Sequence, residues 1–274
     1  MIYGKAALLG IILTAIVSIL AARKYTKIWD EKEPFSYNAM LLLGCFFSSG
    51  PEDIWDKPIE VQAEFWDKNT KFMERGAEAN SLTMTGSHLF DPSFGPRPTK
   101  IVNLAIPSNS DPNYSIPVVC SAPHDAVPET KLPLILYFYM GGLIIGSIEA
   151  ELPISRWLSR EANAVVCSIG YRKAPKYPYP TPINDVVDAS IGILEQHVSV
   201  SSLLGTGIDF DRVATWGISA GGYMSAQATR RLTERGYQLK CQISLVPMAK
   251  PHGGTQSMLT NWNDLWSGPR NVYA

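Results

Sequence analysis

The segment RVATWGISAGG, residues 212–222, decides the fold of this chain. Its apolar run, Val213–Trp216, predicts a short buried strand, and a helix is predicted from about Ala220 to residue 234. The pattern G-x-S-x-G falls between the two, where a nucleophile elbow holds its serine on a strained turn that lifts the hydroxyl out of the sheet. Ser219 is therefore a candidate nucleophile. The alternative interpretation is a Ser/Gly turn that only caps the helix.

Apolar runs and helical stretches alternate on both sides of this segment. This alternation favours an α/β fold with a mostly parallel, twisted sheet and helices on both faces. We expect the sheet domain at residues 99–274, a cap or linker region at 25–98 and an anchor at 1–24. The predicted strands are 101–106, 116–122, 134–139, 164–169, 213–216 and 243–246, and the predicted helices are 58–75, 152–162, 182–197 and 220–234.

A second glycine-bearing turn follows the apolar strand at 134–139. Residues 137–143 read YFYMGGL, so paired glycines come directly after a buried strand. Acyl transfer needs backbone N–H groups aimed at the oxyanion of a tetrahedral intermediate, and glycines in this place expose such groups. Taken alone, the stretch fits a plain turn equally well.

The composition excludes several classes of function. Hydrophobic residues make up 46% of the chain, charged residues 18%, and the formal net charge is −1. This is an ordinary globular composition without the basic excess of a nucleic-acid-binding protein. The sequence contains no GxGxxG, no P-loop and no zinc-spaced cluster, so we expect no cofactor, no metal and no nucleic-acid partner. We expect buried thiols, with one disulfide possible in an oxidising compartment, at Cys45, Cys120, Cys167 and Cys241.

The amino-terminal residues 6–22, AALLGIILTAIVSILAA, form an uncharged apolar run. Its length is near the lower limit of about 17 residues for a membrane span. We favour an uncleaved single-pass anchor in a membrane such as that of the endoplasmic reticulum, with a cleaved signal peptide or a buried helix as alternatives. The basic cluster at 23–27 favours a cytoplasmic domain, whereas the sequon Asn113-Tyr114-Ser115 is compatible with a luminal one.

Three motifs together resemble those of the α/β-hydrolase fold-3 family. This is the hormone-sensitive-lipase-like branch, which includes arylacetamide-deacetylase-like membrane esterases. Residues 137–143 are similar to its oxyanion motif Y-F-H-G-G-G-F, and residues 217–222 to its elbow G-D-S-A-G-G. Between them, residues 171–180, YRKAPKYPYP, are similar to Y-R-L-A-P-E-x-P-F-P, and Asp185 stands where the family has an acidic residue. The resemblance covers roughly residues 100–250.

The resemblance implies a serine carboxylic-ester hydrolase that acts on a small or lipid-like ester. It makes Ser219 the nucleophile and gives the oxyanion hole to the N–H groups of Gly141, Gly142 and Ala220. It gives residues 171–180 and Asp185 a structural role, in which they brace the sheet and the elbow. An aromatic set in the cap region lines an acyl pocket or, in the interpretation we favour, forms ordinary core: Trp55, Phe65, Trp66 and Phe72.

The chain departs from the family pattern at several places. Tyr139 replaces the motif histidine, Met140 its first glycine and Ile218 the acidic elbow residue. A positive φ at Met140 would cost ~1–2 kcal/mol.

In this fold the triad acid and histidine follow the serine. Too few residues follow Ser219 for the two further strands that carry them in the family. We therefore expect a carboxyl-terminal truncation, with an incomplete sheet and without the triad acid and histidine. A substitute triad of Ser219, Asp264 and His252 is disfavoured by its order. The alternatives to an esterase are a catalytically inactive, membrane-tethered binding protein and a truncated gene product.

Overall fold

A computed structural model of the chain describes residues 54–83, 99–195 and 197–248. The short 3-10 helix η1 (Ile54–Asp56) belongs to one compact unit, and the unit considered below begins at Pro58. The predicted anchor at 1–24 lies outside the described residues. Within these ranges no helix is both long and apolar enough to cross a membrane.

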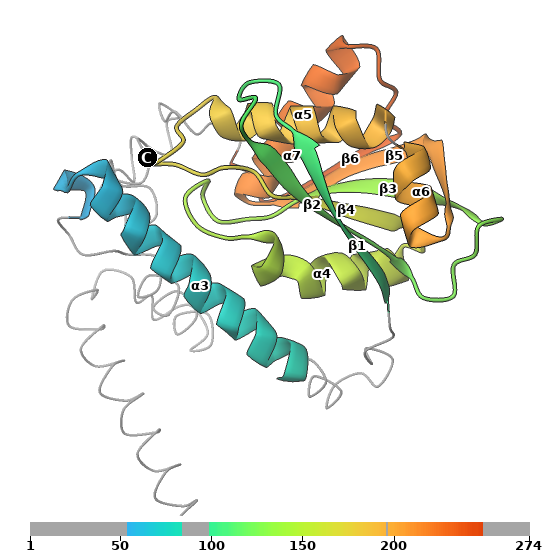
Figure 1. Cartoon of the computed structure of the whole chain (residues 1–274), viewed down its shortest axis with the longest axis horizontal. Helices are drawn as coiled ribbons and strands as arrows, with labels where there is room; N and C mark the ends of the chain where they lie inside the picture. The colour runs from blue at the N-terminus through green and yellow to red at the C-terminus, as the bar shows by residue number, and fades with distance from the viewer. Residues whose placement is uncertain (1–53, 84–98, 196, 249–274) are drawn as a thin grey trace, which may run out of the picture. The chain divides into compact units, whose positions relative to one another are not determined.

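The core of the fold is a six-stranded sheet of order β1-β2-β4-β3-β5-β6 (Figure 1). β3 runs parallel to β4 and β5, and β5 runs parallel to β6, whereas β2 is antiparallel to both of its neighbours. The predicted α/β architecture is thus confirmed as a mixed sheet in which β2 alone runs against the others. The strands are β1 (Thr99–Pro107), β2 (Ser115–Pro123), β3 (Lys131–Phe138), β4 (Val165–Ile169), β5 (Gly207–Ile218) and β6 (Cys241–Leu245).

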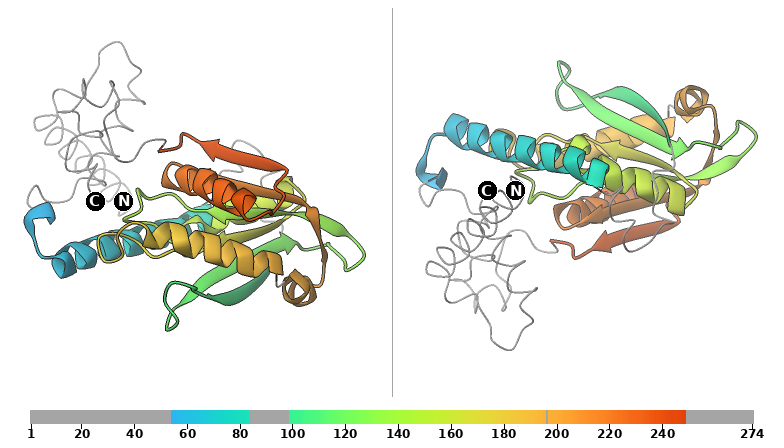
Figure 2. Two further views of the ribbon diagram at one scale, coloured as in Figure 1. Left: turned by 90° about the horizontal axis from the view of Figure 1, so that it is seen from above. Right: turned by 90° about the horizontal axis from the view of Figure 1, so that it is seen from below.

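Helices cover both faces of this sheet (Figures 1 and 2). α4 (Ile148–Glu161) packs on β2 and β4, and α3 (Ile59–Thr83) packs on α4. The opposite face carries α5 (Thr181–Glu195) and α7 (Ala220–Glu234), which contact each other. α6 (His197–Leu204) contacts β1 and β5. Because β3 and β5 are parallel neighbours, their carboxyl ends lie at the same edge of the sheet.

Two elements are longer than the sequence patterns predict. α3 continues past Gly76 to Thr83, because one glycine costs a helix only about 1 kcal/mol and Ala77, Glu78 and Ala79 are good helix formers. β5 begins at Gly207 instead of Val213. Its first residues pair with the start of β3 before a register shift, and the charges at 209–212 hide this strand from an apolar pattern.

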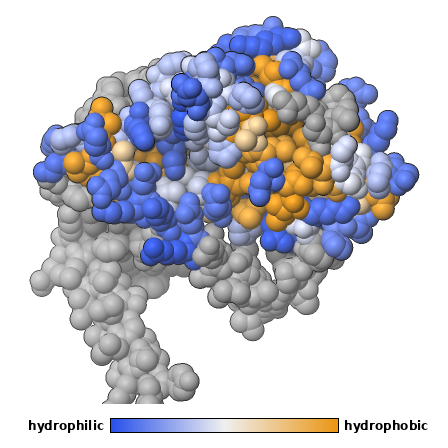
Figure 3. Space-filling view, in the orientation of Figure 1, coloured by the Kyte–Doolittle hydropathy of each residue, from blue (hydrophilic) through white to orange (hydrophobic). Residues whose placement is uncertain are grey.

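The buried core centres on β3 and β4, whose apolar side chains are almost fully enclosed. In the view of Figure 1, β1 crosses the front of the sheet, and apolar residues gather over this part of the surface (Figure 3). Ile101 of β1 is 40% exposed there. As one end of the sheet order, β1 has a strand on only one side within the described part of the chain.

The cysteines differ from the expectation of buried free thiols. Cys120 of β2 lies directly opposite Cys167 of β4 and is joined to it by a disulfide. Cys241 of β6 is a free thiol but is exposed. The favoured expectation of buried free thiols is therefore wrong for these three residues, and the disulfide between Cys120 and Cys167 is the alternative that the sequence left open. Cysteine spacing does not identify this pair, because register and sheet order bring the two residues together. Cys45 lies outside the described residues.

Candidate active site

Ser219 stands on the turn between β5 and α7, with φ 55° and ψ −118°. A non-glycine residue in this region costs about 1–3 kcal/mol and persists only where the surroundings impose it. Here the Ser219 N–H donates to the carbonyl oxygen of Leu245 at 2.9 Å, and its own carbonyl accepts from the N–H of Tyr223 at 3.1 Å. The half-buried side chain makes no capping hydrogen bond to the helix. The Ser219 hydroxyl is therefore not used to cap α7.

The glycines on either side of Ser219 are required by close backbone approach. A Cβ on Gly217 would overlap the carbonyl group of Gly221. A Cβ on Gly221 would overlap the carbonyl oxygen of Phe138 at the end of β3. Any side chain at these two positions would therefore push the elbow away from the sheet.

The glycine turn after β3 lies beside this elbow. Phe138 pairs with Gly217 in the parallel β3–β5 register, so the residues that follow each of them leave the sheet together. Gly141, Gly142 and Leu143 have φ values of 131°, 62° and 69°. Met140 is absent from the residues with positive φ, so the cost considered for it does not arise. Leu143, which the sequence did not single out, bears the strain instead.

A buried carboxylate from α4 holds the residue that precedes the glycines. Glu151 is only 3% exposed. It accepts a hydrogen bond from the Met140 N–H at 3.1 Å and another from the Tyr137 hydroxyl at 2.5 Å. Tyr137 in turn stacks on Trp216 of β5, with ring centroids 4.9 Å apart. Burial raises the pKa of the Glu151 carboxyl, and these two hydrogen bonds oppose that rise. Glu151 therefore links α4, the glycine turn and the strand that leads to Ser219.

Sequence reasoning missed both Glu151 and the Tyr137 hydroxyl. An acidic residue in the first turn of a helix is ordinarily explained by the helix dipole. Nothing in the local pattern distinguishes Glu151 from its exposed neighbour Glu149. Only the packing of α4 under the end of β3 shows which of the two carboxylates reaches the turn.

If the glycine turn is the oxyanion hole that the family resemblance implies, we expect Glu151→Leu to lower kcat for an activated ester by roughly tenfold, less than the 10²–10³ lost with a whole oxyanion donor. The Met140 N–H would lose its partner, which loosens the turn in the transition state while leaving KM nearly unchanged. Glu151→Gln should recover most of kcat because its amide oxygen accepts the same hydrogen bond. Steady-state kinetics, with all variants compared at the same concentration of folded protein, measure kcat and KM separately. An unchanged kcat in a folded Glu151→Leu variant would contradict the role of Glu151 in holding the glycine turn.

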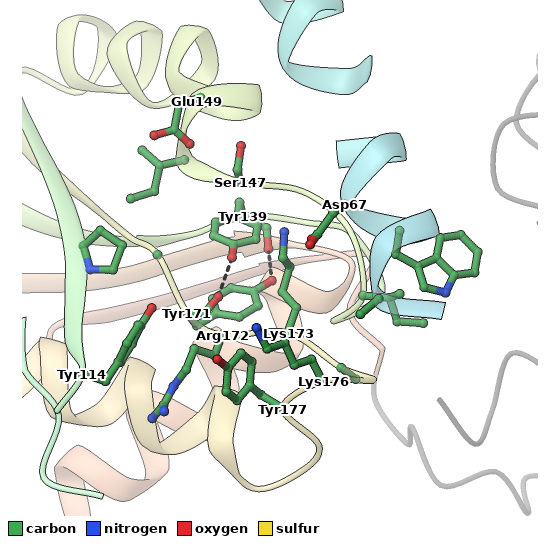
Figure 4. A pocket seen from close by; sticks show the side chains of 17 residues that line it. Asp67, Tyr114, Tyr139, Ser147, Glu149, Tyr171, Arg172, Lys173, Lys176 and Tyr177 are labelled. Atoms are coloured by element: carbon green, nitrogen blue, oxygen red, sulfur yellow. Dashed lines mark hydrogen bonds between the residues drawn. The ribbon is translucent and has the colours of Figure 1, made fainter. Parts of the chain in front are cut away.

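Two tyrosines form a closed pair beneath the glycine turn (Figure 4). The rings of Tyr139 and Tyr171 are stacked with centroids 4.2 Å apart, and both side chains are buried. Each hydroxyl donates to the other residue's carbonyl oxygen at 2.8 Å. Tyr139, which replaces the motif histidine, therefore ties the end of β3 to the segment after β4.

Arg172 and Asp185 form a buried ion pair next to these tyrosines. Asp185 is fully buried and accepts from the Arg172 backbone N–H at 3.0 Å, from its Nε at 2.9 Å and from its Nη2 at 2.8 Å. Arg172 also donates through Nη1 to Asp111 at 2.8 Å, and its guanidinium lies 4.2 Å from the Tyr114 ring centroid. The hydrogen bond with Asp185 is the main cause that raises the pKa of Arg172. Through Tyr171 and Arg172, the segment 171–180 is thus tied to the end of β3 and to Asp185 of α5.

A cavity of about 270 Å³ opens between α3, the turn after β3 and the segment 170–177 (Figure 4). Trp66 lines it and is only 4% exposed, whereas the side chains of Trp55 and Phe72 lie outside the described set. Lys173 donates to the Gly146 carbonyl oxygen at 2.5 Å and to the Thr70 hydroxyl at 3.4 Å, and burial lowers its pKa. Ser219 and the paired glycines are not among its lining residues. The cavity is therefore separate from the elbow.

His124 is a described histidine that lies away from the elbow. His124 follows β2, and because β2 runs antiparallel, His124 lies at the edge of the sheet opposite Ser219. His252 and Asp264 lie outside the described residues, so the substitute triad stays a disfavoured prediction. Within the described ranges, no cluster of His, Cys, Asp and Glu is placed to hold a metal ion.

Comparison with known proteins matches this geometry. Residues 135–269 match a family described as alpha/beta hydrolase fold. An arylesterase of Saccharolobus solfataricus is 33% identical over 146 residues, 53% of this chain and 45% of the relative. Arylacetamide deacetylase-like 3 of Mus musculus is 33% identical over 180 residues, 61% of this chain and 42% of the relative. The matches thus span less than half the length of these two relatives.

Solved structures show the same fold. The esterase of Pyrobaculum calidifontis superposes with a TM-score of 0.61 at 20% identity, covering 84% of this chain and 66% of that one.

Proposed function

Because residues 135–269 match a family described as alpha/beta hydrolase fold, we propose that the chain is a serine carboxylic-ester hydrolase. In this proposal Ser219 is the nucleophile, and the N–H groups of Gly141, Gly142 and Ala220 form the oxyanion hole. The observation that carries the proposal is the positive φ of Ser219 at a strand-to-helix turn, beside the glycine turn of β3. A serine that only caps a helix needs no such strain.

The proposed reaction is acyl transfer in two steps. The Ser219 Oγ attacks the ester carbonyl carbon, the bond to the leaving alcohol breaks and an acyl-enzyme forms. Water then attacks the acyl group, releases the carboxylic acid and restores the hydroxyl. Backbone N–H groups stabilise the oxyanion of each tetrahedral intermediate. A general base accepts the Ser219 proton and passes it to the leaving alcohol, and no residue of the described ranges is assigned that role.

The relatives narrow the proposed substrate to carboxylic esters. Their names include an arylesterase and arylacetamide deacetylase-like proteins, which supports a small aryl or alkyl ester or a lipid-like one. We place the protein on a membrane through residues 1–24, because the apolar run at 6–22 has the length and charge-free character of a span.

Covalent labelling tests this proposal. The full chain is treated with a fluorophosphonate probe, which phosphonylates activated serine hydroxyls, and the adduct is located by peptide mass spectrometry. We expect one adduct, on Ser219, that heat-denatured protein does not form. The Ser202→Ala variant, which changes an exposed serine of α6, should label normally. A folded chain without an adduct, or with one elsewhere, overturns the proposal and favours a catalytically inactive binding protein.

A further inference from the structure

The turn between β1 and β2 carries the one Asn-x-Ser/Thr triplet of the sequence, Asn113-Tyr114-Ser115. Such a triplet accepts an N-linked glycan where it lies on the surface of a protein that enters the secretory pathway. Asn113 and Ser115 are both exposed. Tyr114, between them, is partly buried.

Tyr114 holds this triplet in a defined conformation. Its N–H donates to the carbonyl oxygen of Asp111 at 2.9 Å, and its carbonyl accepts from the N–H of Ser108 at 2.9 Å. Its ring packs over the guanidinium of Arg172. The middle residue is thus anchored to the protein while the side chains on either side of it face solvent.

The disulfide is a second observation that points to the secretory pathway. Cys120 and Cys167 are fully buried and bonded across β2 and β4. Disulfides persist in the lumen of the endoplasmic reticulum and outside the cell and are rare in the cytosol. Asparagine glycosylation takes place in that same lumen. A glycan on Asn113 and the disulfide between Cys120 and Cys167 would therefore both form in this lumen.

We propose that Asn113 is an N-glycosylation site and that the unit beginning at Pro58 faces an oxidising lumen. This orientation is opposite to the one that the basic residues after the apolar run favour. The proposal does not depend on the chemistry of Ser219.

A glycan in this place would also protect β1, which within the described residues has a neighbouring strand on only one side. Ser115 pairs with Pro107, the last residue of β1, so the glycan would stand at the end of that edge strand. Ile101, toward the opposite end of β1 from Pro107, is 40% exposed. Exposed edges of this kind pair with other chains unless a bulky or charged group obstructs them. The polar glycan would obstruct that pairing.

The test is expression of the full chain in a eukaryotic cell, followed by digestion with an N-glycosidase. We expect the digested wild-type chain to migrate faster by the mass of one glycan. Asn113→Gln and Ser115→Ala should abolish this shift, whereas Ser115→Thr preserves the triplet and should retain it. Asn103→Gln, an exposed asparagine outside any such triplet, should also retain it. Since the glycan is transferred during synthesis, misfolding of a variant does not remove the shift.

Alkylation of thiols before and after reduction accompanies this test. We expect two more cysteines to react after reduction in the unfolded wild-type protein, and Cys120→Ala to abolish that difference. A wild-type chain without a glycosidase shift overturns the proposal, whatever the state of the cysteines. If both cysteines also react without reductant, the unit faces a reducing compartment. Labelling of Ser219 is measured separately and is affected by neither outcome.

Discussion

Where a histidine serves Ser219 as general base, Ser219→Ala is expected to lower kcat for ester hydrolysis by about 10⁶-fold, the loss found when the serine nucleophile is removed from a catalytic triad. Alanine cannot form the acyl-enzyme, so only binding and the oxyanion hole remain to accelerate attack by water. The measurement is the rate of release of a chromogenic alcohol from a short-chain ester by full-length protein. Ser202→Ala is the matched control, and its rate should equal that of the wild type. Equal rates for Ser219→Ala and the control would contradict the assignment.

Ser219→Gly separates the chemical role of this residue from its backbone strain. Alanine and serine both carry a Cβ, so both retain the cost of φ 55°. Glycine adopts positive φ without this penalty, and we expect it to stabilise the fold by ~1–2 kcal/mol relative to Ser219→Ala. Both variants should be equally inactive. A glycine variant less stable than the alanine variant would show that the turn is not strained at this residue.

Asp185→Ala is expected to destabilise the protein by about 3–5 kcal/mol, because it leaves the Arg172 charge without its buried partner. Asp185 accepts three hydrogen bonds from Arg172 and is fully buried. The free energy of unfolding in denaturant measures the loss. We also expect reduced activity, since the segment that carries Arg172 continues from Tyr171 and its contacts with the turn after β3.

Asp111→Ala is the matched control for this ion pair. Asp111 also bonds Arg172, but its side chain is 40% exposed, and exposed ion pairs contribute about 0–1 kcal/mol. We therefore expect a small loss that shrinks further in high salt. Equal destabilisation by the two variants would show that burial does not determine the strength of this contact.

The relatives and the charge pattern bear on different parts of the chain. The family match begins within β3 at residue 135, so it concerns the sheet, the glycine turn and the elbow. The predicted anchor and the side of the membrane rest on residues 1–27 and on the proposed glycan. The labelling experiment therefore tests the proposed esterase activity, and the glycosidase experiment independently tests the proposed glycosylation of Asn113.

Local patterns in the sequence determined which segments form strands of the sheet and where the elbow lies. Buried parallel strands are continuous apolar runs, so 134–139 and 164–169 are recognisable without any contact. Gly217, Ser219 and Gly221 lie within five residues of one another, and their spacing alone defines the turn. The family resemblance then added the roles of the second glycine turn and of residues 171–180.

Tertiary structure alone decided how distant residues meet. Glu151 reaches the Met140 N–H because α4 packs back on the sheet. Cys120 meets Cys167 because β2 runs antiparallel beside β4, and the same reversal carries His124 to the far edge. Each of these depends on strand order, direction or helix packing, which join residues far apart in the chain and leave no mark on short-range spacing.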